Sequence, residues 1–139
     1  MSPHQASLRM ALAVLCLFAA VHAQNWAVRA TIPFDFTADQ QAFAAGEYCI
    51  STDGSEAVRL ARVDVLQKAE IVTVRIRSTA EATPRIVFHR YAERHFLAEV
   101  WLGEPNRGRQ VYASAAELEL ARTTKQEVTT IIATLVPTK

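Results

Sequence analysis

Alternation of apolar and polar residues with a period of two is the feature that most restricts how this chain folds. In one stretch Val72, Val74 and Ile76 alternate with polar neighbours, and similar patterns run through 26–32 and 58–61. Successive side chains of a β-strand point to opposite faces, so this alternation is typical of half-buried strands. We expect a mostly β fold: a single-domain antiparallel β-sandwich or small barrel of about seven or eight strands.

One helix is predicted in the C-terminal region. Ser114-Ala115-Ala116-Glu117 reads as a capping box, in which the Ser114 hydroxyl accepts a hydrogen bond from the Glu117 amide. The residues that follow are rich in Ala, Leu and Glu, which are strong helix formers. We therefore expect an α-helix at about 115–123, after which the β pattern resumes at 128–136.

The first 23 residues resemble an export signal. Arg9 precedes a continuous apolar run, Met10 to Val21, which is about 18 Å long as a helix. A bilayer core is roughly 30 Å thick, so the run is too short for a stable membrane span. With Val21-His22-Ala23 as the cleavage site, residues 1–23 are predicted to be a signal peptide. The expected product is one β-rich domain at 24–139, secreted or periplasmic, with no membrane span; the alternative is a short N-terminal core helix.

Composition excludes several classes of function. The chain has 15 Lys and Arg against 14 Asp and Glu, so it lacks the basic excess of a nucleic-acid-binding protein. After signal removal only Cys49 remains, so no internal disulfide can form and the apolar core must hold the fold. The sequence contains no phosphate-binding glycine loop and no CxxC, HExxH or G-x-S-x-G motif. We therefore expect no cofactor and assign no catalytic residue.

Residues 85–102, RIVFHRYAERHFLAEVWL, predict a hairpin whose turn length decides which side chains share a face. A two-residue turn at Ala92-Glu93 leaves both faces mixed, whereas a three-residue turn at 92–94 separates an apolar face from a polar and aromatic one. Cleaner segregation favours the three-residue turn. That register brings together the four residues that we predict to bind a ligand: His89, Tyr91, His95 and Trp101.

The same register adds Glu99 to the face that carries His89 and His95. Two imidazoles and one carboxylate are plausible zinc ligands. Histidines beside aromatic residues are more commonly hydrogen-bonded members of an aromatic patch, and we favour that interpretation over a metal site.

Four sequence blocks resemble a known family. They are IPFDF (32–36), AGEY (45–48), VFHRY (87–91) and FLAEVW (96–101). In the same order, such blocks are found in a family of short, secreted, uncharacterised bacterial proteins. The resemblance covers nearly the whole chain after residue 23 and implies a secreted β-rich domain without an established activity. This chain has Ala44 where the family pattern has Pro, and Ala92 where it has Gly.

Three functions remain open at this point. The leading hypothesis is a non-enzymatic module that binds a ligand or an envelope partner, such as a glycan, through the face of the 85–102 hairpin. The alternative is a structural, self-assembling envelope protein in which the same aromatic residues belong to the core. The third is a small hydrolase whose histidines and acids converge in space, with the acids drawn from Asp35, Glu47, Glu93 and Glu99.

Overall fold

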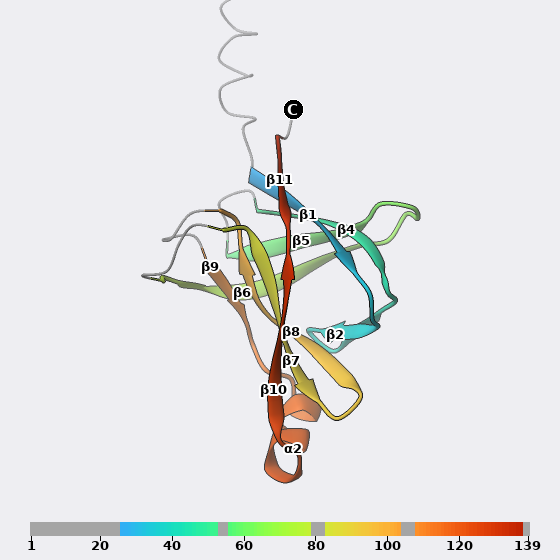
Figure 1. The fold of residues 1–139 in the computed structure, drawn as a ribbon, viewed down its shortest axis with the longest axis vertical. Coiled ribbons are helices and arrows are strands. Elements are labelled where there is room, and N and C mark those ends of the chain that lie inside the picture. The colour runs from blue at the N-terminus through green and yellow to red at the C-terminus, as the bar shows by residue number, and fades with distance from the viewer. Residues whose placement is uncertain (1–25, 53–55, 79–82, 104–107, 138–139) are drawn as a thin grey trace, which may run out of the picture.

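The computed structural model describes residues 26–52, 56–78, 83–103 and 108–137 (Figure 1). The predicted signal peptide at 1–23 lies outside the described residues. In chain order the elements are β1 (Trp26–Ile32), β2 (Phe36–Ala38), β3 (Gln41–Phe43), β4 (Gly46–Thr52), β5 (Ala57–Arg62), β6 (Lys68–Ile76), β7 (Arg85–Tyr91), β8 (Arg94–Trp101), β9 (Gly108–Val111), α2 (Ala115–Thr123), β10 (Gln126–Ile132) and β11 (Thr134–Pro137).

The prediction of a mostly β fold with one helix near the C-terminus is confirmed. Helix α2 occupies the predicted range, and its Ser114 cap accepts a hydrogen bond from the Glu117 amide at 3.2 Å. The strands outnumber the expected seven or eight because β2 and β3 have only three residues each and the C-terminal β segment divides at Ala133. Within the described ranges, no helix combines the length and the apolar character needed to span a bilayer.

All strands belong to one sheet that does not close. The order is β10-β7-β8-β9-β6-β5-β4-β1-β11, and every pair along this path is antiparallel. The short β2 pairs with β3 and runs parallel to β8. The two outermost strands, β10 and β11, follow each other in the chain, so one segment reaches both edges of the curved sheet (Figure 1).

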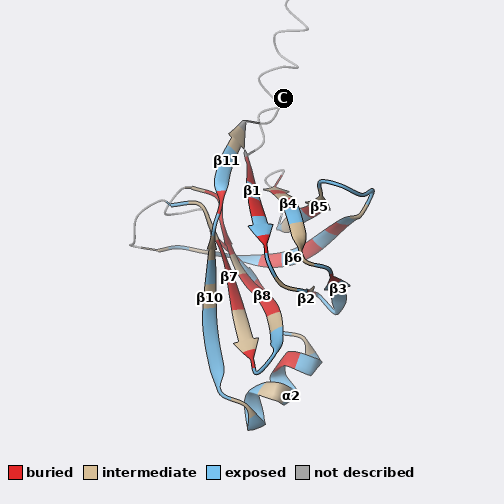
Figure 2. Ribbon diagram, turned by 45° about the vertical axis from the view of Figure 1, so that its right-hand side comes forward, coloured by how far each residue is buried: buried red, intermediate tan, exposed pale blue. Residues whose placement is uncertain are grey.

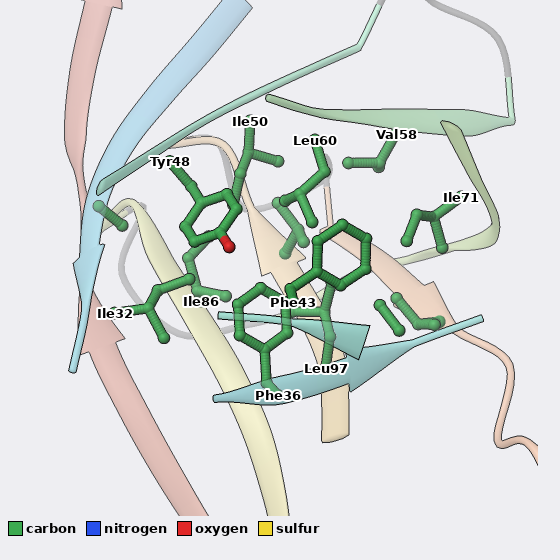
Figure 3. Close-up of a cluster of buried hydrophobic side chains, with 14 of the residues drawn as sticks. Ile32, Phe36, Phe43, Tyr48, Ile50, Val58, Leu60, Ile71, Ile86 and Leu97 are labelled. Atoms are coloured by element: carbon green, nitrogen blue, oxygen red, sulfur yellow. The ribbon is translucent and has the colours of Figure 1, made fainter. Parts of the chain in front are cut away.

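The inner face of this sheet encloses an apolar core that includes an aromatic cluster (Figure 3). The Phe36 ring lies 5.2 Å from Phe43, 5.3 Å from Tyr48 and 5.3 Å from Phe88, measured between centroids. All four side chains are almost completely buried, and burying each contributes about 2–3 kcal/mol. The Tyr48 hydroxyl donates to the Ala44 carbonyl at 2.5 Å, which satisfies its polar end. This cluster anchors the β2–β3 hairpin to the rest of the sheet.

The predicted three-residue turn between β7 and β8 is wrong. Tyr91 pairs with Arg94, which leaves a two-residue turn at Ala92-Glu93. Ala92 adopts a positive φ of 55° there. Tight two-residue hairpin turns match the twist of their strands and require positive φ, so Ala92 adopts a conformation that a glycine would take more easily.

Farther from the turn, a β-bulge changes which side chains of the hairpin share a face. Without it, the short turn would place apolar and polar side chains on both faces. The pairing shifts between Val87 and Phe88, so that Phe88 faces Leu97 while Ile86 faces Val100. An extra residue on one strand reverses the alternation of its side chains. The bulge, rather than the turn, therefore keeps the apolar residues of both strands on the core side.

Replacing Ala92 by glycine should stabilise the protein. A non-glycine residue at positive φ carries a steric cost, so Ala92→Gly is expected to raise the free energy of unfolding by about 1 kcal/mol. Urea denaturation followed by circular dichroism measures this change. The matched control is Ala42→Gly, an exposed alanine without positive φ, which should lower the stability instead. Equal losses in both variants would contradict the assigned turn.

Candidate functional site

The register of the β7–β8 hairpin separates the four residues predicted to bind a ligand. Alternation along the paired strands places His89, Tyr91 and Trp101 on the outer face, and places His95 on the inner face beside Phe88 and Leu97. The two-residue turn causes this separation, because it shifts the first residues of β8 by one position relative to the predicted register.

His89 and Tyr91 hold neighbouring elements against the hairpin. The Nδ1 atom of His89 lies 3.3 Å from Oε1 of Glu117, the buried residue of α2. The Tyr91 hydroxyl donates to Oε1 of Gln126 on β10 at 3.1 Å, and only 3% of this residue is exposed. Burial raises the pKa of Tyr91, and the nearby Glu117 carboxylate adds to the rise. Both residues therefore fasten α2 and β10 to the sheet.

Trp101 is also enclosed by its neighbours and is 5% exposed. Its Nε1 donates to Oε2 of Glu99 at 3.0 Å, and the Arg85 guanidinium lies 4.6 Å from the ring centroid. The ring covers Gly108, where an added Cβ would come within 2.5 Å of it. Glycine at 108 thus creates the space that the indole fills.

The three weakly predicted zinc ligands do not converge. His95 lies on the opposite face of the hairpin from His89 and Glu99, and Glu99 is hydrogen-bonded to Trp101. Across the described ranges, no group of three or more His, Cys, Asp or Glu side chains is arranged to hold a metal ion. Cys49 is a free, half-buried thiol.

His95 instead opens onto a cavity of about 390 Å³ at the tip of the β7–β8 hairpin. A second cavity, of about 430 Å³, shares Thr37, Ala42 and Arg94 with the first and extends to the beginning of α2. We call the two together the tip groove. The first is lined by Asp35, Phe36, Thr37, Ala42, Phe43, Ala44, Glu93, Arg94 and His95, and the second by Thr37, Gln40, Ala42, Arg94, Ser114, Ala115 and Ala116.

The His95 ring is fixed by stacking. It lies parallel to the Phe34 ring at a centroid distance of 3.7 Å, and Phe34 in turn contacts Phe88 edge-on at 4.9 Å. Burial lowers the pKa of His95, the Arg90 guanidinium lowers it further, and Glu93 opposes the shift. The imidazole is therefore neutral at pH 7 and presents one donor and one acceptor. Among the described residues, no hydrogen bond reaches either ring nitrogen.

Strained backbone is concentrated around the tip groove. In the described part of the chain, the non-glycine residues with positive φ are Asp39 (48°), Gln40 (66°) and Ala92 (55°). Asp39 and Gln40 form the β2–β3 turn, and Ala92 begins the β7–β8 turn. Both are two-residue hairpin turns, which require positive φ.

Of the four residues predicted to bind a ligand, only His95 lines the tip groove. Arg94, Thr37 and Gln40 were not predicted there from the sequence; the polar Asp39-Gln40 pair, which forms the β2–β3 turn, is the local signal that could have indicated it. The four acids considered for hydrolysis do not all lie at the same place either. Asp35 and Glu93 line the groove, Glu47 forms an ion pair with Arg29 at 2.7 Å, and Glu99 accepts from Trp101.

No protein-family model, curated protein or solved structure matches the chain. Function is therefore inferred from the tip groove and from the residues that surround it. The resemblance of the four sequence blocks to a secreted family remains an expectation.

The burial of His95 predicts its titration behaviour. In a histidine-detected NMR titration, its pKa should lie below the usual 6.5, and Arg90→Gln should move it upward because a nearby positive charge is removed. With a lowered folded-state pKa, the contribution of His95 to stability is fully present above 6.5 and decreases as the pH falls through the folded value. The matched control, Arg122→Gln on the exposed face of α2, should leave the pKa of His95 unchanged. An unshifted pKa in the wild-type protein would contradict the stacked, half-buried position of the ring.

Proposed function

We propose that this protein is a secreted or periplasmic, non-enzymatic binding module whose ligand occupies the tip groove. The carrying observation is the cavity of about 390 Å³, which falls in the size range of small-molecule sites. Phe36 and Phe43 give it apolar lining, and its charged and polar lining residues, which we call the rim, include Asp35, Glu93, Arg94 and His95. The predicted export signal and the resemblance to a secreted family support the location.

The chemistry of the rim favours an uncharged, polyhydroxylated ligand. Arg94 offers only donors, Asp35 and Glu93 offer acceptors, and neutral His95 offers both. One oxygen of Asp35 already accepts from the Ala45 amide at 2.9 Å, so its second oxygen remains for a ligand. Two carboxylates face one guanidinium, so the lining has a net negative charge, which disfavours an anionic ligand. Sugar hydroxyl groups both donate and accept, so we infer that the ligand is an oligosaccharide of the cell envelope.

Binding is better supported than hydrolysis. A catalytic acid or base must lie within hydrogen-bonding reach of its partner or substrate, and a nucleophile needs an oriented base beside it. In the part of the chain that the structure describes, no hydrogen bond joins Asp35, Glu93 and His95 to one another. The groove therefore carries polar groups suited to recognition, without an assembled catalytic pair.

The structural, self-assembling alternative draws support from a different observation. Tyr91 and Trp101, the aromatic residues expected at a recognition face, are 3% and 5% exposed. Their contacts fasten β10 and β9 to the hairpin, which is the role that this alternative assigns to them.

An oligosaccharide array followed by calorimetric titration tests the binding proposal. The probes are peptidoglycan fragments and other bacterial envelope oligosaccharides. For any binder, Arg94→Ala and His95→Ala should each weaken the affinity at least tenfold, which corresponds to the loss of about 1.4 kcal/mol. Tyr112→Ala, an exposed aromatic residue outside the groove, is the matched control and should bind normally. No binder on the array, or equal losses in the control, would overturn the proposal.

A further inference from the structure

Strand β10 forms one edge of the sheet, and no other described strand covers its outer side. Among the described strands it pairs with β7 alone, over all seven residues and without a register shift. Figure 2 shows it at the margin of the sheet, exposed along most of its length. Edge strands present unpaired N–H and C=O groups, and proteins usually guard them with lysine, proline, bulges or a covering segment. Residues 126–132 contain neither lysine nor proline.

The side chains of β10 are also suited to contact with another strand. Val128 is 61% exposed and Ile132 is 67% exposed, with exposed Thr130 between them on the same face. The one charge of the strand, Glu127, lies with its Oε2 3.7 Å from Nη1 of Arg90 on β7. The row formed by Val128, Thr130 and Ile132 on one face of β10 is therefore uncharged, and all three are β-branched residues, which favour strands.

We propose that β10 is a self-association edge, at which two copies of this chain pair antiparallel about a two-fold axis at Thr130. In this register, Thr130 faces Thr130 of the second copy, and Val128 faces Ile132 of the second copy. The same surface serves both molecules, as a two-fold interface requires. The inference goes beyond the tip groove and rests instead on the self-assembling alternative, to which it gives a defined surface.

Complementarity argues for a second copy over another occupant. Pairing about Thr130 sets β-branched residues opposite each other, and such cross-strand pairs stabilise a sheet. Glu127 falls opposite Ala133 of the second copy, so no like charges meet. A charged strand from another protein would instead place its charges against exposed Val128 and Ile132.

The C-terminal end of β10 approaches β1. A cavity of about 340 Å³ lies beside Ile132 and Thr134, lined on its other side by Arg29, Ala30, Thr31 and Glu47. A single strand-to-strand contact buries less than the roughly 1,200 Å² of a stable interface. We therefore expect a reversible dimer that forms at high protein concentration.

Analytical ultracentrifugation of the full chain purified from an exporting host tests the inference. Sedimentation from about 10 µM to about 1 mM should show a monomer–dimer equilibrium. Thr130→Lys and Thr130→Glu place like charges at the two-fold axis, so each alone should remain monomeric. An equimolar mixture of the two variants should restore the dimer, because the opposite charges then meet.

Two controls separate this result from misfolding and from the tip groove. Circular dichroism should show both Thr130 variants folded, and Gln110→Lys on the outer face of β9 should dimerise as the wild type does. Arg94→Ala should lose oligosaccharide binding without losing the dimer. A wild type that is monomeric throughout, a dimer that persists in Thr130→Lys, or folded variants that fail to recombine would each overturn the inference. The first of these results is also the one expected if β10 pairs with a strand of another protein.

Discussion

The C-terminal segment pairs with both edges of the sheet, and the remaining architecture depends on this arrangement. β10 lies beside β7, and β11 lies beside β1, although only Ala133 separates the two strands. The Ala133 amide donates to the Pro84 carbonyl at 3.0 Å, which fixes the crossing point. Because one continuous segment forms both ends of a nine-strand order, the sheet must curve and enclose its apolar face. The core therefore forms without a disulfide.

The curvature also explains where the polar features lie. On one side, β8 pairs with β7. On its other side, residues 99–101 of β8 pair with β9, and residues 95–96 pair with β2. The tip groove lies on the β2 side of this fork, where the aromatic cluster anchors β2 and β3. Helix α2 then reaches the hairpin through Glu117 and His89. Among the described strands, β10 has a partner only on its β7 side, because the chain turns at Ala133 and continues as β11 beside β1.

Local signals in the sequence predicted the fold class and the helix, while the site depended on contacts between distant residues. Period-two alternation identified β6, but pairing with β5 turns Ile71 and Thr73 inward and leaves Val72 and Val74 exposed. Thr73 tolerates burial because its hydroxyl donates to the Glu56 carbonyl at 2.6 Å. Tyr91 and Trp101 were predicted to bind a ligand, yet Gln126 and Gly108 bury them. No local pattern reveals partners this far along the chain, nor the bulge that sets the faces of the hairpin.

Amide hydrogen exchange at residues 126–137, measured by NMR in the native state, tests the central claim most directly. If the C-terminal segment holds both edges of the sheet, the Ala133 amide and the paired amides of β11 should exchange only with global unfolding, as slowly as the core amides of β4. Fast exchange throughout 126–137 while β4 stays protected would mean that the sheet keeps its curvature without this segment, and it would contradict the account.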